Sequence, residues 1–288
     1  MSAIQRYLAP TTLEEALDAL RESEATILAG GTDVMPQSQA GRLRLQPTLL
    51  NIRRIDELGG IALDGASIRI GALATISELL ESELINERLP ILAEAADHFA
   101  SPQIRNAGTV GGNVCNASPA GDTLVPLIVL NAEVELASKR DGKVERRRMP
   151  LESFFAGPGR THRAADELLT AIYVPAPAEG FVAHFAKFGT RPALDISAVS
   201  VGIGGVWRNG TFKNARVAFG AVAPTPVRGR ATEGVLEGSA LDAAAIGMAA
   251  AAARDEVRPI SDVRASAWYR KEMIHSLTKK VLTNVADA

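Results

Sequence analysis

A short apolar run that stops at two glycines limits how the amino-terminal part of this chain can fold. Residues 25–29 predict a short buried strand, and the turn after it reads Ala29, Gly30, Gly31, Thr32, Asp33 and Val34. Glycine tolerates positive φ, so backbone N–H groups in such a turn can point together at the start of a helix, which suits a phosphate. The alternative, from this segment alone, is an ordinary strand-to-helix turn with Thr32 or Asp33 as the N-cap.

A second glycine-rich segment lies within a long polar stretch, residues 101–122. It reads Gly108, Thr109, Val110, Gly111, Gly112 and Asn113. A stretch so poor in packing residues is usually functional or disordered, and the apolar helix expected after it argues against disorder. A surface loop with several turns is the alternative. Neither segment matches G-x-G-x-x-G followed by an acid about 20 residues later, so the pair favours a diphosphate cofactor held between two small subdomains over a Rossmann fold.

The remaining patterns predict a mixed α+β chain. Capping boxes at Thr12 with Glu15 and at Thr75 with Glu78 mark helix starts. We expect strands at 49–52, 61–63, 68–70, 134–137, 143–147 and 168–174, and helices at 13–20, 89–99 and 123–131. After a linker at 175–180 come long strands at 182–187, 196–207 and 212–219, the last two joined by Asn209 and Gly210, and then helices at 241–254 and 265–285. A meander followed by helices predicts a separate carboxy-terminal α+β domain, with an antiparallel sheet.

Composition and residue usage argue against several functions. The 288 residues carry a net charge of −2, so no basic field points to nucleic acid. No apolar run approaches the roughly 20 residues that span a bilayer, and the start does not resemble a signal peptide, so we expect a cytoplasmic protein. Cys115 is the only cysteine, which excludes an internal disulfide and an iron–sulfur cluster held by this chain alone. We interpret it as a buried or loop-lining thiol, and the four scattered histidines predict no metal site.

Other patterns that could carry chemistry are weaker. The sequence contains neither the nucleophile elbow G-x-S-x-G nor the phosphate loop G-x-x-x-x-G-K-[ST]. Lys187, Arg191 and Asp195 recur every fourth residue around a bend expected at 189–192. Taken alone, these three residues are interpreted as a surface salt-bridge group, which contributes little to stability.

Together the motifs resemble the FAD-binding medium subunit of the molybdenum hydroxylases, the family of xanthine dehydrogenase and aerobic carbon monoxide dehydrogenase. The resemblance extends over essentially the whole chain. It rests on the two glycine segments, Asp122, Leu168, Leu169, Lys187, Arg191 and Asp195, and on matches at 103–106, 116–119, 264 and 269–270. It implies the two-part FAD module of the vanillyl-alcohol oxidase type and a carboxy-terminal α+β domain. We expect the subdomains at 1–57 and 58–176, and the last domain at 177–288.

The resemblance also implies roles for single residues. The segment 29–34 and the residues Thr109, Gly111, Gly112 and Asn113 would cradle the FAD diphosphate. Asp122 would bind the sugar or ribityl side, Phe99 would lie near the flavin or adenine ring, and Leu169 would line the ring pocket. Lys187 would lie near the polar edge of the flavin, where a cation favours the reduced anion and raises the potential. No residue of this chain is expected to act as a catalytic acid or base.

The electron path that the resemblance implies needs partner chains. It implies a small subunit with two [2Fe–2S] clusters and a large subunit with the molybdenum cofactor, usually in a dimer of such heterotrimers. Electrons would reach FAD from the clusters and leave to NAD, a quinone, oxygen or a carrier protein. The leading hypothesis is therefore an electron-transfer subunit. A stand-alone flavin oxidase or reductase, and a scaffold that has lost FAD, are the alternatives; the substrate and the acceptor stay open.

Overall fold

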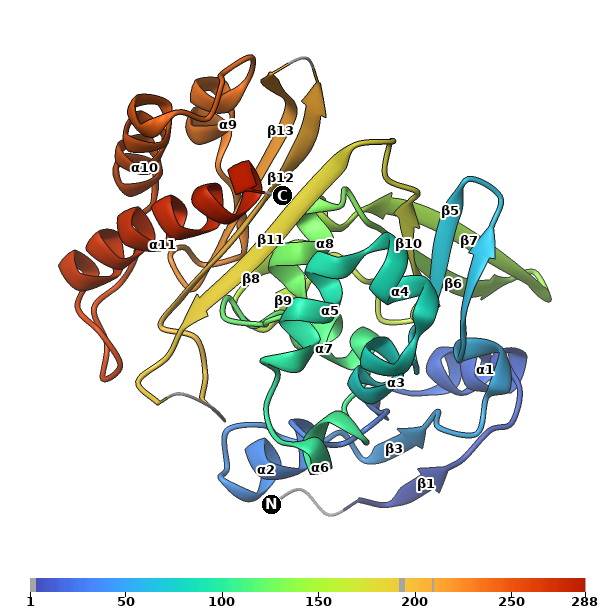
Figure 1. Ribbon diagram of the computed structural model, residues 1–288. Helices are drawn as coiled ribbons and strands as arrows, with labels where there is room; N and C mark the ends of the chain where they lie inside the picture. The colour runs from blue at the N-terminus through green and yellow to red at the C-terminus, as the bar shows by residue number, and fades with distance from the viewer. Residues whose placement is uncertain (1–3, 192–194, 209, 288) are drawn as a thin grey trace.

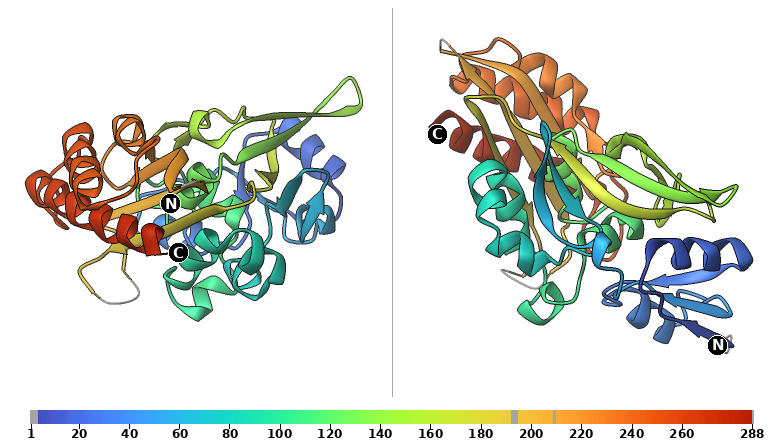
Figure 2. Two further views of the ribbon diagram at one scale, coloured as in Figure 1. Left: turned by 45° about the horizontal axis from the view of Figure 1, so that its top comes forward. Right: turned by 90° about the vertical axis from the view of Figure 1, so that its right-hand side faces the viewer.

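A computed structural model describes residues 4–191, 195–208 and 210–287. Within these residues, three larger sheets follow one another along the chain, each with its own helices, and a small two-stranded sheet accompanies the second (Figure 1). Two further views show that the small amino-terminal sheet lies at one end of the molecule and the carboxy-terminal helices at the other (Figure 2). The chain therefore has the mixed α+β class that the sequence predicts.

The first sheet is parallel, in the order β1 (Arg6–Leu8), β3 (Thr48–Asn51) and β2 (Ala25–Leu28). α1 (Leu13–Glu22) begins at the predicted capping box, where Thr12 Oγ1 accepts from Glu15 N and the Glu15 carboxylate accepts from Thr12 N. Its apolar face packs against β3 and the short 3-10 helix η1 (Asp56–Leu58). α2 (Val34–Gln39) follows β2 and has no buried residue.

The second sheet is antiparallel, in the order β4 (Ile61–Asp64), β5 (Ser67–Gly71), β10 (Leu168–Pro175), β6 (Glu133–Arg140) and β7 (Lys143–Pro150). Its core includes residues of α3 (Ile76–Glu81), α4 (Glu83–Arg88), α5 (Pro90–Asp97), α7 (Val110–Asn116) and α8 (Leu124–Val129). All six residues of α8 are buried, and this helix contributes to the core of the second unit. Smaller elements are α6 (Pro102–Arg105), η2 (Leu151–Ser153), β8 (Phe155–Gly157) and β9 (Arg160–Thr161).

The third sheet is the predicted meander, in the order β11 (Phe181–Phe188), β12 (Val199–Arg208), β13 (Thr211–Gly220) and β14 (Val227–Arg228). Arg208 pairs with Thr211 across Gly210, whose φ is 70°; Asn209 of the expected turn lies outside the described residues. α9 (Arg230–Leu236), α10 (Ala243–Glu256) and α11 (Ala267–Asp287) contribute to its second core. α5 and α8 contact the same sheet from the second unit, so this sheet joins two cores.

Glutamate carboxylates accept hydrogen bonds from backbone N–H groups at both edges of the third sheet. β14 pairs only with Ala218 and Phe219, so the earlier part of β13 is itself an edge. There Glu237, the C-cap of α9, accepts from two consecutive N–H groups of β13, and Glu233 of α9 accepts from Val217 N at 2.9 Å. At the opposite edge, Glu94 of α5 accepts from Phe185 N at 2.7 Å. Edge strands otherwise expose rows of unpaired backbone groups, and these carboxylates occupy some of them.

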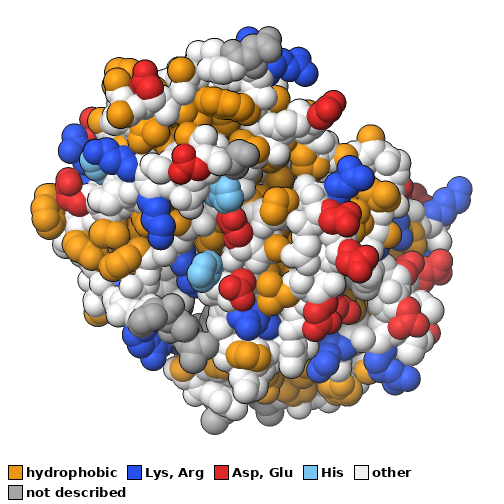
Figure 3. Space-filling model, viewed as in Figure 1, with side chains coloured by type: hydrophobic (Ala, Val, Ile, Leu, Met, Phe, Trp, Pro, Cys, Tyr) orange, Lys and Arg blue, Asp and Glu red, His pale blue; other side chains and the backbone are white. Residues whose placement is uncertain are grey.

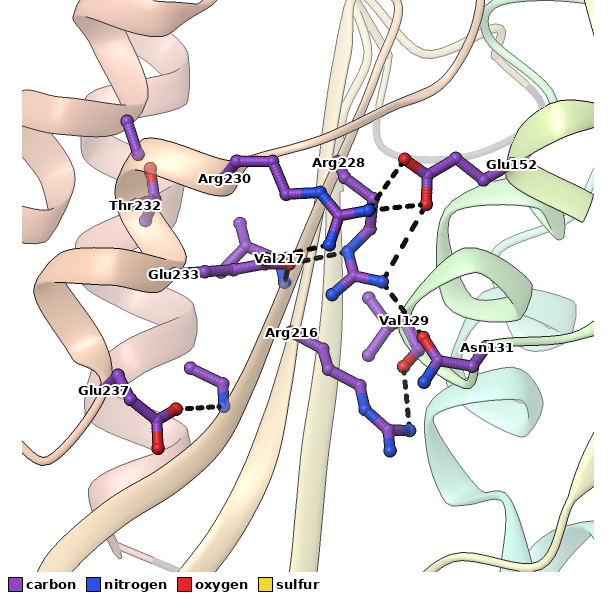
Figure 4. A network of polar contacts seen from close by, with 12 residues as sticks. Val129, Asn131, Glu152, Arg216, Val217, Arg228, Arg230, Thr232, Glu233 and Glu237 are labelled. Carbon is purple, nitrogen blue, oxygen red and sulfur yellow. Dashed lines mark hydrogen bonds and ion pairs between the residues drawn. The ribbon is translucent and has the colours of Figure 1, made fainter. Parts of the chain in front are cut away.

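A network of ion pairs fastens the third unit to the second (Figure 4). Arg230 Nη2 lies 3.0 Å from each oxygen of Glu152. Arg228 donates from Nε to Glu233 at 2.6 Å and from Nη1 to Asn131 Oδ1 at 3.0 Å. The Arg228 side chain is 9% exposed and that of Arg230 is 63% exposed, so the Arg228 pair is the less screened of the two. A cavity of about 320 Å³ lies beside these residues.

Several elements differ from the sequence expectation. The strand expected at 25–29 ends at Leu28 and is half-buried rather than buried. The stretch 101–122 contains α6 and α7, and Val110 and Val114 of α7 are fully buried. Short elements with little apolar periodicity were missed, namely β1, β8, β9, β14, α4 and α9. Their formation depends on tertiary pairing and on polar contacts, which a hydrophobic pattern does not record.

Candidate functional site

The first glycine turn presents a run of free backbone donors. It follows β2, and Gly31 has a φ of 73°, which only glycine adopts at little cost. Among the described residues, the backbone N–H groups of residues 30–34 donate to no acceptor. Asp33 stands at the N-cap of α2, but its carboxylate accepts from Gln37 Nε2 at 2.5 Å instead of capping the helix. Burial raises the pKa of Asp33, and the hydrogen bond from Gln37 opposes that shift.

The two glycine segments lie against each other. A Cβ on Gly30 would stand 1.9 Å from Ala107 O, and a Cβ on Gly108 would stand 3.4 Å from Thr32 Oγ1. Gly30 is therefore required because one backbone passes directly over another, not because of its φ. The fold thus brings the two glycine segments together at this contact.

The second segment forms the start of α7. Thr109 is its N-cap, and Thr109 Oγ1 accepts from Gly112 N at 3.0 Å. Gly111 is buried, and a Cβ there would stand 2.6 Å from Ala72 O, so this glycine serves close packing. Gly112 is exposed, and Asn113 Oδ1 accepts from Thr123 Oγ1 at 2.6 Å. The N–H of exposed Gly112 is thus already bonded within the segment, whereas the side-chain Nδ2 of Asn113 donates to no acceptor among the described residues and stays open to a ligand.

Asp122 and Lys187 form one buried pair. Lys187 Nζ lies 2.7 Å from Asp122 Oδ2, and each side chain is 10% exposed. Ser197 Oγ donates to Asp122 Oδ1 at 2.8 Å, and Lys187 Nζ also donates to the carbonyl of Asp195 at 3.2 Å. The surface salt-bridge interpretation is wrong for Lys187, because its partner is a buried carboxylate 65 residues earlier. The bend expected at 189–192 ends at Pro192, which lies outside the described residues.

The two apolar candidates differ in exposure. Phe99 follows α5, is partly buried, and packs against the core of the second unit. Leu169 of β10 is 2% exposed and belongs to that same core, next to an irregularity in the pairing of β10 with β6. Phe99 is therefore the more accessible of the two to a bound ring.

Sequence reasoning missed the residues that hold these candidates in place. Ala107 makes the contact with Gly30, and Ser197 donates to Asp122, but neither residue type signals such a role. Cys115 packs against the core as expected, and burial raises the pKa of its thiol to about 11. Within the described residues, no group of three or more His, Cys, Asp or Glu side chains could hold a metal ion. No helix in that part of the chain is long and apolar enough to cross a membrane.

The face drawn in Figure 1 is shown with its side chains in Figure 3. Histidine and acidic side chains lie close together in the middle of this face, and apolar side chains gather over the carboxy-terminal helices. Met248 of α10 and Trp268 of α11 are among the exposed apolar residues, at 60% and 71% exposure.

Comparison with known families decides what the two turns belong to. Residues 2–177 match the FAD binding domain in molybdopterin dehydrogenase. Residues 184–285 match the CO dehydrogenase flavoprotein C-terminal domain. The chain belongs to the FAD-binding subunits of the molybdenum hydroxylase family.

Individual relatives agree along their whole length. The xanthine dehydrogenase FAD-binding subunit of Escherichia coli O157:H7 is 35% identical over 98% of this chain and 96% of that protein. The carbon monoxide dehydrogenase medium chain of Hydrogenophaga pseudoflava is 33% identical, over 96% of this chain and 95% of that one. A solved structure of carbon monoxide dehydrogenase from Hydrogenophaga pseudoflava, lacking the Mo-pyranopterin moiety, superposes with a TM-score of 0.93 at 33% identity, covering 99% of this chain and 98% of that one. The expected fold, a two-part FAD module followed by an α+β domain, is confirmed.

This FAD-binding subunit is thus a flavoprotein component of an oxidoreductase. Its own residues fit the cofactor: the free N–H groups at 30–34 offer donors for a diphosphate, and the contact between Gly30 and Ala107 places the second segment beside them. Backbone donors in an already ordered turn cost less entropy to immobilise than a flexible side chain.

Proposed function

We propose that this chain is the electron-carrying flavin subunit of a molybdenum-containing hydroxylase or dehydrogenase with several subunits. Its membership of the family and the run of free backbone donors at 30–34 support the proposal. Bound FAD can exchange electrons singly or in pairs, which joins one-electron and two-electron partners. Substrate oxidation belongs, in this proposal, to another chain.

The residues of this chain bind and orient the cofactor. Ala29, Gly30, Gly31, Thr32, Asp33 and Val34 form one side of the diphosphate site, and Thr109, Gly111, Gly112 and Asn113 form the other. Phe99 and Leu169 are assigned to the rings, Asp122 to the sugar or ribityl side, and Lys187 to the polar edge of the flavin. In the proposed division of the chain, residues 29–34 belong to subdomain 1–57, Lys187 belongs to the carboxy-terminal domain at 177–288, and the other assigned residues belong to subdomain 58–176.

Lys187 acts on the cofactor through its charge. The ammonium is held at 2.7 Å from Asp122 and 3.2 Å from the Asp195 carbonyl, in a setting with little exposure. A charge in such a setting acts more strongly than it would in water. Because Asp122 compensates part of this charge, we expect Lys187 to raise the flavin potential by less than an isolated cation would.

Partner chains complete the electron path. We propose a small subunit with [2Fe–2S] clusters and a large subunit with the molybdenum cofactor, in line with relatives named as medium chains. NAD, a quinone, oxygen or a carrier protein would be the external acceptor, and a cytoplasmic location is part of the proposal.

Purification of the native complex tests this function. We expect FAD absorbance from this chain, and iron and molybdenum in the chains that co-purify with it. An organic substrate should reduce the flavin only when those chains are present. Rapid reduction of the purified single chain by such a substrate would favour a stand-alone flavin oxidase or reductase instead. A chain that takes up no FAD would favour a scaffold that has lost its cofactor.

A further inference from the structure

We propose that Ser197 is a positioning residue that, through Asp122, sets the pH dependence of the reduction potential of the bound flavin. The inference rests on the proposed function, in which Asp122 and Lys187 face the cofactor. It adds a residue that neither the glycine segments nor the family motifs indicate.

Three separate segments meet at the Asp122 carboxylate. Asp122 comes from the connection between α7 and α8, Lys187 from β11, and Ser197 from the residues just before β12. Lys187 Nζ donates to Oδ2 at 2.7 Å, and Ser197 Oγ donates to Oδ1 at 2.8 Å. Asp122 is 8% exposed and Ser197 is 1% exposed, so water does not replace either donor easily. The hydroxyl of Ser197 therefore fixes the plane of the carboxylate and the oxygen that faces Lys187.

Lys187 keeps one donor for a ligand. Its ammonium has three N–H donors. Asp122 Oδ2 and the carbonyl of Asp195 accept two of them, and within the described ranges no third acceptor is present. The orientation of Asp122 decides where this third donor points. Because Ser197 fixes that orientation, it acts indirectly on the polar edge of the flavin.

Few other charges act on this carboxylate. Burial raises the pKa of Asp122, while Lys187, Ser197 and the more distant His98 at the end of α5 lower it. The carboxylate of Asp195 is turned to Thr190 and to the backbone N–H of residue 191. On the same strand as Lys187, His184 Nδ1 lies 2.6 Å from Glu94 Oε1. Lys187 and Ser197 are therefore the direct hydrogen-bonding groups that favour the ionised form of Asp122.

The direction of the effect follows from charge. Protonation of Asp122 removes a negative charge beside the flavin and leaves Lys187 uncompensated, which raises the potential below the pKa of Asp122. Loss of the Ser197 hydroxyl removes a donor to the ionised form, which raises that pKa further. The inflection in a plot of potential against pH then moves to higher pH.

Redox potentiometry of the FAD-loaded chain at a series of pH values tests the inference. We expect Ser197→Ala to move the inflection upward by about one pH unit, the scale of a lost hydrogen bond to a charged group. Ser197→Thr, which keeps the hydroxyl, should restore the wild-type profile. Ser197→Cys keeps the volume with a weaker donor, so it should give a smaller shift in the same direction and serves if the alanine variant does not fold.

Ser200→Ala is the matched control. Ser200 is also 1% exposed, and its Oγ has no hydrogen-bond partner among the described residues. Its profile should superimpose on that of the wild type. The pKa of Asp122 can also be followed in the FAD-free chain by infrared titration, with its carboxyl band identified as the one that Asp122→Asn lacks. Ser197→Ala should show the same upward shift of this pKa.

Two results would overturn the inference. One is a Ser197→Ala profile that superimposes on the wild type although both chains hold FAD. The other is a shift of the carboxyl pKa that leaves the flavin potential unmoved, since Ser197 would then act on Asp122 alone. A wild-type chain that takes up no FAD would refute the proposed function itself, so the two failures are distinguishable.

Discussion

Gly30→Ala tests whether the two glycine segments must touch for FAD to bind. The added Cβ would stand 1.9 Å from Ala107 O and 2.7 Å from its carbonyl carbon, both backbone atoms that no rotamer change can move. Restoring the 3.4 Å of ordinary contact requires the two backbones to separate by about 1.5 Å. Such overpacking costs about 1–3 kcal/mol of folding free energy.

The same separation acts on the cofactor. A shift of this size takes backbone donors of one segment out of reach of a diphosphate held by the other. Losing one hydrogen bond to a charged group costs about 1.5–3 kcal/mol, so we expect FAD affinity to fall by about 10- to 100-fold. Equilibrium titration followed by flavin fluorescence measures the affinity, and urea unfolding of the FAD-free chain measures the stability.

Gly247→Ala provides the control. Gly247 lies in α10 with nothing within 4 Å of its Cβ position, so alanine there should stabilise the helix by up to about 1 kcal/mol and leave FAD affinity unchanged. If Gly30→Ala bound FAD as tightly as the wild type, the two segments would not act as one site.

Three further changes have defined outcomes. Lys187→Met, made in an Asp122→Asn background to avoid a lone buried carboxylate, should lower the flavin potential and weaken FAD binding relative to Asp122→Asn alone. An unchanged flavin potential in potentiometry would show that Lys187 does not act on the cofactor. Hydrogen bonds from Arg147 hold the pKa of Glu167 below its ordinary value, so its stabilisation is complete above the unfolded-state pKa and is lost as pH falls through the folded-state pKa. In urea, Glu167→Gln should cost about 1 kcal/mol at neutral pH and progressively less in acid; a pH-independent loss would contradict this. Arg228→Met should cost about 1.5–3 kcal/mol, because it removes the charged donor 2.6 Å from Glu233 and leaves that carboxylate with Val217 N and the more distant Arg230. Exposed Arg230→Ala should cost under about 1 kcal/mol, and equal losses in thermal unfolding would refute the difference.

Local signals were sufficient for much of the fold. The capping boxes at Thr12 and Thr75 start α1 and α3 as predicted, because both partners lie within one helical turn. The meander and its helices also follow from periodicity over long segments. The three-residue strand β1 has no such signal, since it exists only through its pairing with β3.

The site shows the same division between local and distant information. The free donors after β2 follow from a strand that ends in two glycines, and they were expected from the sequence. The packing of Gly30 on Ala107 and the pairing of Asp122 with Lys187 join residues far apart in the chain. Only the tertiary fold brings such residues together, so no local pattern could predict these contacts.

The carboxylates at the edges of the third sheet bear on how this subunit can assemble. Glu233 and Glu237 occupy backbone N–H groups of β13, and Glu94 occupies one of β11. A strand from another protein that tried to extend this sheet would have to displace ionised acceptors from those positions. Neighbouring chains should therefore recognise this domain by the shape and charge of its side chains. The same glutamates should also hinder aggregation through strand addition.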